Sequence, residues 1–79
     1  MKILRIDSQA VRQAGYDAST KRLRIEFSSG VIYEFENISR QRCNALVGAS
    51  SFGRYLNKYI VARPDRYPFK KLGKLEHDD

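Results

Sequence analysis

Residues 21–36 read KRLRIEFSSGVIYEFE, and this stretch decides the fold. Apolar side chains take every second position on each side of Ser28–Gly30, as in two half-buried strands joined by a short turn. A three-residue loop over 28–30 keeps the two faces separate, whereas a two-residue turn would set Ile25 opposite Glu34. The predicted pairs are Phe27 with Val31, Ile25 with Tyr33, Leu23 with Phe35, Arg24 with Glu34 and Arg22 with Glu36. The loop also puts Gly30 where a bulged hairpin needs positive φ, and a slip of one residue would reverse every side chain.

This register predicts the character of the two sheet faces. The outer face carries cross-strand pairs of opposite charge and has no aromatic side chain. We therefore do not expect the sheet to act as a base-stacking platform. Tyr33 and Phe35 are expected to face the core, with the Tyr33 hydroxyl at its edge.

Two more extended segments precede the hairpin. Residues 10–17 read as a strand that the polar turn 17–20 joins to Lys21, and Lys2–Ile6 is a further extended segment at the edge of the sheet.

The pattern becomes helical after Ile38. Ser39 is the expected N-cap of a first helix whose apolar stripe is Cys43, Leu46 and Val47 and which stops at Gly48. A second helix opens at Ser50 or Ser51. Its predicted core stripe is Phe52, Leu56, Tyr59 and Ile60, with Tyr55 beside it. Pro64 and Pro68 prevent its continuation beyond Ala62.

The sequence thus predicts an α+β fold: an antiparallel meander of three to four strands, followed by two short helices packed on one face. We expect a single domain over residues 1–72 and a disordered C-terminal tail over residues 73–79. Tyr67 and Phe69 should hold the start of the C-terminal segment against the body.

Composition indicates where in the cell the protein is expected to be. The longest uncharged apolar stretch, residues 45–49, is far shorter than the ~20 residues of a membrane span. The single Cys43 cannot form an intramolecular disulfide, so nothing points to an oxidising compartment. We expect a cytoplasmic protein with no membrane association.

Positive charge is concentrated in the second half of the chain. Residues 38–74 hold nine Lys and Arg against one acid, Asp65, while residues 1–37 hold six against five. This asymmetry favours a polyanionic or acidic partner, and the alternative is a solvated face that keeps the protein soluble.

The sequence contains few residues suited to catalysis or metal binding. The chain has one Cys and one His, with Cys43 on the apolar stripe of a helix, where it is expected to be inert, and His77 in the tail. The turn 49–53 could hold an anion beside Arg54, although ordinary helix capping explains it better. We expect no enzymatic activity, no cofactor and no metal.

Several features together resemble the KTSC domain, named for the C-terminus of certain lysyl-tRNA synthetases and found also in small bacterial and phage proteins. The resemblance covers about residues 8–67. It rests on Gly15-Tyr16-Asp17, the alternating strand at residues 23–27, Gly30, and Tyr33-Glu34-Phe35 where the family has Tyr-x-Tyr. It also rests on residues 49–57, which match a run of Ala-x-Ser-x-Gly before an aromatic and an Asn. The residues that match family motifs are Tyr16, Gly30, Tyr33, Phe35, Ser51, Gly53 and Asn57. The family's role is not settled, and RNA binding is what its synthetase context implies.

Two functions from different classes follow. The first is non-catalytic binding of nucleic acid, RNA first, by the basic helical half. The residues expected to contact phosphates or donate hydrogen bonds are Arg40, Arg42, Ser50, Ser51, Arg54, Asn57, Lys58, Arg63, Arg66, Lys70 and Lys71. The second is a protein-interaction or accessory module that docks an acidic partner or self-associates through a free sheet edge. The sequence does not fix the oligomeric state.

Overall fold

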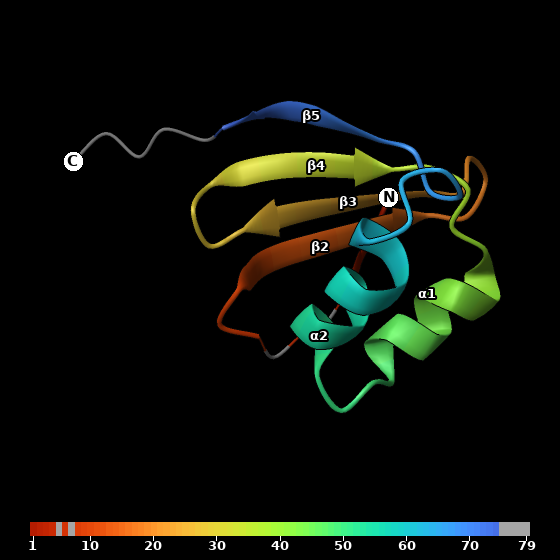
Figure 1. Ribbon diagram of the computed structural model, residues 1–79, viewed down its shortest axis with the longest axis horizontal. Helices are drawn as coiled ribbons and strands as arrows, with labels where there is room; N and C mark the ends of the chain where they lie inside the picture. The colour runs from red at the N-terminus through yellow and green to blue at the C-terminus, as the bar shows by residue number, and fades with distance from the viewer. Residues whose placement is uncertain (5, 7, 75–79) are drawn as a thin grey trace.

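The computed structural model describes residues 1–4, 6 and 8–74. Five antiparallel strands form one sheet in the order β1-β2-β3-β4-β5 (Figure 1). The strands are β1 (Lys2–Leu4), β2 (Val11–Asp17), β3 (Arg22–Phe27), β4 (Val31–Phe35) and β5 (Phe69–Lys74). Between β4 and β5 the chain forms α1 (Arg40–Val47), α2 (Phe52–Leu56) and a π-helical turn, η1 (Asn57–Val61). The α+β class and the meander followed by two helices are confirmed.

The central hairpin has the predicted register. Leu23 lies opposite Phe35, Arg24 opposite Glu34, and Ile25 opposite Tyr33. Gly30 has φ 92°, and its N–H donates to the carbonyl of Phe27 at 2.8 Å. The three-residue loop therefore follows from the need to keep the apolar and charged faces apart.

The two N-terminal segments add strands on one side of the hairpin. β2 pairs with β3 through a bulge between Val11 and Gln13, and β1 pairs with β2. At the turn after β2, the Asp17 carboxylate accepts hydrogen bonds from the backbone N–H and the hydroxyl of Ser19. These bonds hold the pKa of Asp17 below its ordinary value. Arg5, in the expected extended segment, lies outside the described residues.

The first helix begins and ends as predicted. The Ser39 hydroxyl accepts from the backbone N–H of Arg42 at 3.0 Å, and Gly48 is the C-cap. Cys43 and Leu46 of the predicted apolar stripe are buried, but Val47, the third residue of that stripe, is exposed and does not join the core. Val47 lies beside Met1 and Ile3 along a groove between α1 and the N-terminal strand.

The second helix starts at its Ser51 cap and changes character at Asn57. Phe52, Leu56 and Ile60 are buried as expected. In η1 the N–H of Ala62 donates to the carbonyl of Asn57, five residues back, which widens the turn. Tyr59 points outward and is 40% exposed, so its predicted place in the core is wrong.

The fifth strand is a correction to the predicted strand count. β5 returns after the helices to pair with β4, with Phe69 opposite Phe35 and Lys71 opposite Tyr33. It continues to Lys74, two residues past the expected domain end at Leu72. The rest of the expected tail, residues 75–79, lies outside the described residues.

Burial concentrates between the sheet and the helices. Leu23, Ile25, Ile38, Leu46 and Leu56 are fully buried, and Tyr67 packs against the same cluster. The helices cover the sheet on its β2 side, while β4 and β5 extend beyond them (Figure 1). In the part of the chain that the structure describes, no helix is long and apolar enough to cross a membrane.

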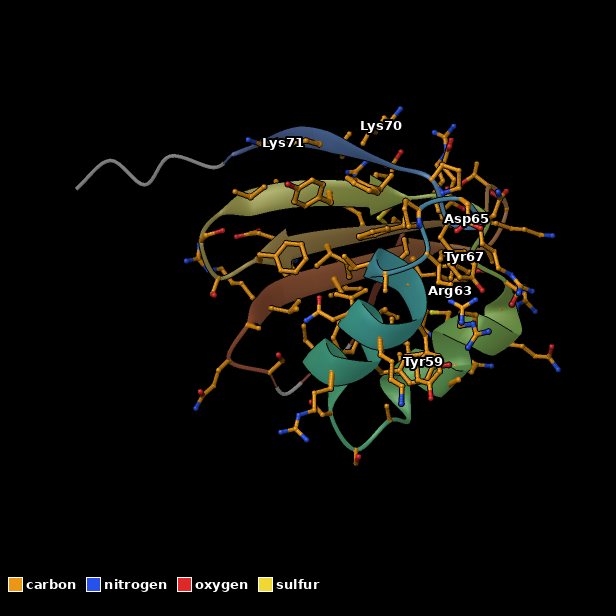
Figure 2. All side chains as sticks on the ribbon, viewed as in Figure 1. Tyr59, Arg63, Asp65, Tyr67, Lys70 and Lys71 are labelled. Carbon is orange, nitrogen blue, oxygen red and sulfur yellow. The ribbon has the colours of Figure 1, made fainter. Side chains whose placement is uncertain are left out.

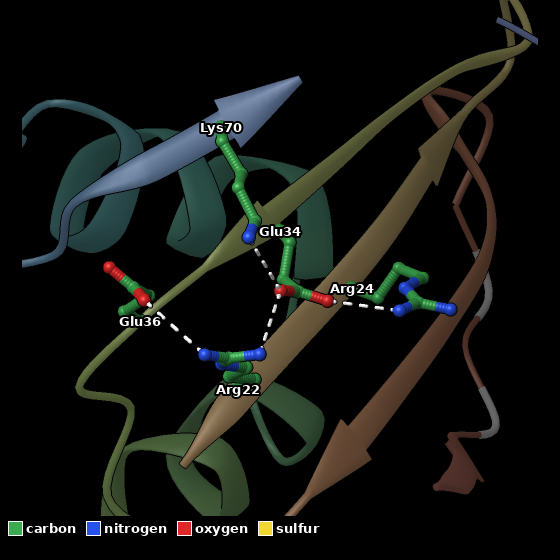
Figure 3. A network of polar contacts seen from close by, with 5 residues as sticks. All are labelled: Arg22, Arg24, Glu34, Glu36 and Lys70. Carbon is green, nitrogen blue, oxygen red and sulfur yellow. Dashed lines mark hydrogen bonds and ion pairs between the residues drawn. The ribbon is translucent and has the colours of Figure 1, made fainter. Parts of the chain in front are cut away.

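The outer sheet face carries a charged network around Glu34. This carboxylate is 3% exposed and lies 3.0 Å from Arg24, 3.6 Å from Arg22 and 4.0 Å from Lys70 (Figure 3). Glu36 contacts Arg22 at 3.8 Å but is half exposed. Arg12 pairs with Glu26 on the neighbouring strand.

We predict that Gly30→Ala lowers the free energy of unfolding by about 1–2 kcal/mol, because a Cβ is strained at positive φ. Urea denaturation followed by circular dichroism measures it. Ser28→Ala, an exposed change in the same loop, should be nearly neutral. Equal stability of the two variants would contradict the tight-turn geometry.

Glu34→Gln and Glu36→Gln form a second matched pair. Glu34→Gln should cost about 1.5–3 kcal/mol because it weakens charge-assisted hydrogen bonding at a buried position. Glu36→Gln, which changes an exposed pair, should cost less than about 1 kcal/mol. The same denaturation experiment measures both, and a reversed order would show that Glu34 does not hold the outer face.

Candidate nucleic-acid interface

A cluster of one arginine and three tyrosines lies on the helical layer. The Arg42 Nη1 donates to the Tyr55 hydroxyl at 2.7 Å, and its Nε donates to the Tyr67 hydroxyl at 3.2 Å. The guanidinium carbon lies 6.0, 5.8 and 6.0 Å from the ring centroids of Tyr55, Tyr59 and Tyr67. We call Arg42, Tyr55, Tyr59 and Tyr67 the Arg42 cluster.

Local structure explains how these four side chains meet. The Ser39 cap sets Arg42 in the first turn of α1, facing the next helix. The ring centroids of Tyr55 and Tyr59 lie 4.6 Å apart, with the ring planes tilted by 41°, where α2 passes into η1. Tyr67 is held in the following loop, where its N–H donates to the carbonyl of Arg63 at 2.8 Å.

The charge of Arg42 is held by hydroxyl groups instead of a carboxylate. Hydrogen bonds to Tyr55 and then Tyr67 raise the pKa of Arg42 above its ordinary value, so the side chain stays cationic. Among the described residues its Nη2 has no hydrogen-bond partner, which leaves N–H donors for a ligand. An arginine held in this way can bind an oxyanion.

Other cations border the Arg42 cluster. Lys58 lies 5.4 Å from the Tyr59 ring centroid, and the Arg66 guanidinium lies 5.9 Å from that of Tyr67. Arg63 and Tyr67 lie on this side of the molecule in Figure 2. The exposed Asp65, the single acid between residues 38 and 74, is close to them.

The other predicted contact residues are distributed more widely. Arg40, Ser50, Arg54 and Asn57 are exposed on α1, the interhelical turn and the second helix. The Ser51 hydroxyl accepts from the N–H of Arg54 at 3.3 Å. This bond is the capping role that the sequence favoured for the turn 49–53.

Two of the lysines of β5, Lys70 and Lys71, lie on different faces of the sheet. Lys70 points to the outer face, where it contacts Glu34. Lys71 is exposed and lies opposite Tyr33 in the register, and Figure 2 shows both lysines at the sheet edge, away from Tyr59. The predicted basic residues therefore do not all share one face.

Most of the family-motif residues have structural roles. The Tyr16 hydroxyl donates to the carbonyl of Ile38 at 2.6 Å, and burial is the main cause that raises its pKa. Gly30 makes the hairpin turn and Phe35 is buried. Gly53 brings the second helix close to Ser8 and Ala10 before β2. The remaining motif residues are Tyr33, which is half buried, Ser51, which caps α2, and Asn57, which begins η1.

Sequence reasoning missed the tyrosines of the Arg42 cluster as functional candidates. Tyr55 and Tyr59 are four residues apart, a spacing that places two side chains on one helix face, but both were assigned to the core or its margin. Tyr67 comes close to these two tyrosines because of the path that the chain takes after Pro64. No local pattern indicated that contact.

Chemistry at Cys43 is disfavoured by its surroundings. The thiol is buried among apolar side chains, and burial is the main cause that raises its pKa. Within residues 1–4, 6 and 8–74, no three Cys, His, Asp or Glu side chains come together as metal ligands. His77 lies outside these residues.

Comparisons with known proteins find similarity in sequence and in fold. The sequence model of the KTSC domain matches residues 7–63. The chain is 35% identical to an uncharacterized protein of Stutzerimonas stutzeri over 91% of this chain and 99% of that one. It is 33% identical to a segment of a lysine–tRNA ligase of Nostoc punctiforme, over 89% of this chain but 12% of the ligase. A crystal structure of a KTSC domain protein from Yersinia pestis superposes with a TM-score of 0.78 at 21% identity, covering 91% of this chain and 97% of that one.

Double-mutant analysis tests the Arg42 cluster. Arg42→Met and Tyr55→Phe should each destabilise the fold, and their effects should couple by about 0.5–1.5 kcal/mol because one hydrogen bond is removed by either change. Arg22→Met, on the outer face, combined with Tyr55→Phe should be additive within about 0.5 kcal/mol. Additive effects of Arg42→Met and Tyr55→Phe would refute the contact.

Proposed function

The chain belongs to the KTSC domain family, and from this premise we propose that it is a non-catalytic nucleic-acid-binding protein whose basic helical half contacts the phosphates of RNA. The Arg42 cluster is the centre of the contact surface. Lys58, Arg63 and Arg66 surround it, and Arg40 and Arg54 extend it along the helices. In this proposal the protein acts in the cytoplasm, without a cofactor.

The observation that carries the proposal is the choice of hydrogen-bond partners around the Arg42 guanidinium. A half-buried guanidinium normally pairs with a carboxylate, but Arg42 is held by two tyrosine hydroxyls, which are neutral. Its full positive charge therefore remains for a ligand, and its Nη2 is available to donate. Phosphate oxygens match both the charge and the donor geometry of a guanidinium.

The distribution of ion pairs supports the same surface. The ion pairs among described residues link Arg12, Arg22, Arg24 or Lys70 to glutamates of the outer face. Within the described part of the chain, none of the Lys and Arg side chains between residues 40 and 66 makes such a pair. The positive charges that no carboxylate neutralises thus include those of the helical side, where phosphate binding would release condensed counterions.

RNA is favoured over DNA by the relative that resembles this chain. A lysine–tRNA ligase, which by its name acts on a tRNA, contains a segment 33% identical to this chain over 70 residues. For a module that is part of such an enzyme, the tRNA is the polyanion that it is expected to meet. We extend that ligand class to this chain.

A second function, self-association or docking of a protein, is favoured by one specific observation. β1 is an edge strand; Ile3 on it and Met1 just before it are more than half exposed beside the groove at Val47. An unpaired edge with apolar side chains can add a strand from another chain. This surface lies at the opposite edge of the sheet from β5.

Fluorescence anisotropy with a labelled structured RNA, duplex DNA and heparin, each at two salt concentrations, tests the proposal. Lys58→Gln/Arg66→Gln should lower RNA affinity about 10-fold and reduce the salt slope by about 1–2, because each phosphate contact contributes to that slope. The charge-matched control Arg12→Gln/Lys70→Gln removes two cations that pair with glutamates on the outer face of the sheet, opposite the helices. It should change affinity less than about 2-fold.

Two results would overturn the proposal. One is no binding of RNA at low salt. The other is equal loss of affinity in both double variants, with heparin bound as well as RNA, which would show only non-specific attraction to polyanions.

A further inference from the structure

A row of aromatic rings crosses the helix-side face of the sheet where the helices do not cover it. Phe27 on β3, Tyr33 on β4 and Phe69 on β5 form this aromatic row. The Tyr33 centroid lies 5.8 Å from that of Phe27 and 5.6 Å from that of Phe69, with interplanar angles of 78° and 75°. The strand register puts Phe69 beside Phe35 and Tyr33 beside Ile25, so all three rings share the face that carries the core.

The aromatic row runs from the core into solvent. Phe35, which borders the row on the side of the core, is 2% exposed, and its ring centroid lies 5.8 Å from that of Phe69. Phe69 itself is 48% exposed, while Phe27 and Tyr33 are half buried. A hollow beside the row is lined by Ala10, Phe27, Ser28, Ser29, Val31 and Tyr33. Rings held by their neighbours and open on one side can accept a flat ligand at little entropic cost.

Charge around the aromatic row indicates an anionic ligand. Lys71 lies opposite Tyr33 on the same face and is exposed. The glutamates of these strands, Glu26 and Glu34, point to the opposite face, where they pair with arginines and Lys70. A ligand with flat rings and a negatively charged backbone complements this combination better than an uncharged apolar peptide does.

The aromatic row also adjoins the Arg42 cluster. Tyr67, which accepts the hydrogen bond from Arg42, is followed by Pro68 and then by Phe69, the first residue of β5. Figure 2 shows Tyr67 near the segment that leads to Lys70 and Lys71. A strand whose phosphates contact Arg42 therefore needs to extend only a short distance to reach Phe69.

We propose that the aromatic row stacks unpaired bases, so that the protein selects single-stranded over duplex RNA, with Lys71 contacting the backbone. This inference rests on the proposed function and deepens it by naming the strand state of the ligand. Bases in a duplex are already stacked within the helix, whereas unpaired bases present their faces to aromatic rings. Among the described residues the outer face has no such rings, as the sequence predicted. The expectation that the sheet offers no base-stacking platform is limited in this proposal to the outer face, because β5 exposes Phe69 on the inner face.

The test compares a labelled single-stranded RNA with a blunt-ended RNA duplex of equal phosphate number, using the whole chain. Wild type should bind the single strand more tightly. Phe69→Ala should lower single-strand affinity about 10-fold, since one stacked base contributes on that scale, and leave duplex affinity within about 2-fold. Phe69→Trp should keep single-strand binding because the ring is retained.

Controls separate stacking from loss of apolar area and from charge. Leu72→Ala removes a side chain of similar exposure (42%) from the same strand and should leave both affinities unchanged. Lys71→Gln should reduce the salt slope for the single strand by about 0.7, whereas Phe69→Ala should leave that slope unchanged.

The outcomes separate this inference from the proposed function. Equal binding of both RNAs, with Phe69→Ala harmless, would overturn base stacking but leave phosphate binding in place. Binding of neither RNA would overturn both. A concentration-dependent dimer in sedimentation that Phe69→Ala dissociates would assign the aromatic row to a second copy of the chain and would also overturn the inference.

Discussion

The fold depends on the pairing of the Glu34 carboxylate with Arg22 and Arg24 on the outer face of the sheet. Residues on one strand alternate between faces, so fixing Glu34 outward also fixes Tyr33 and Phe35 inward. A carboxylate that is only 3% exposed tolerates no other orientation without losing its partners. The long side chains of the arginines and Lys70 cover it, so polar groups close a face that no helix packs against.

This arrangement has an electrostatic consequence on the other side of the molecule. Glu26, Glu34 and Glu36 are all held by cations of the sheet, so they are directed away from the helices. The arginines of α1, α2 and the following loop make no ion pair among the described residues, and Arg42 is oriented by tyrosine hydroxyls. A chain with a net charge of +6 thus presents unequal faces, one neutralised and one basic.

Local pattern predicted most of the fold. The alternation from Leu23 to Phe35 predicted the register. Ser39 marked the start of the first helix, and the pair Ser50 and Ser51 marked that of the second, because each signal depends on near neighbours. The failures depend on distant parts of the chain. β5 forms only because β4 offers an unpaired edge, since Phe69–Lys74 has no clear alternation. Tyr59 turns outward because η1 changes the helical period.

The candidate site was harder to predict than the fold for the same reason. The sequence located the excess of positive charge and named Arg42, but it did not show that this side chain meets Tyr55 and Tyr67 across 13 and 25 residues of chain. Nor did it show the aromatic row, because exposure of Phe69 requires a fifth strand. Both features depend on the segment after Pro64, which brings Tyr67 to the helices and Phe69 to the sheet. That one segment therefore links the phosphate-binding surface to the rings that we propose for base stacking.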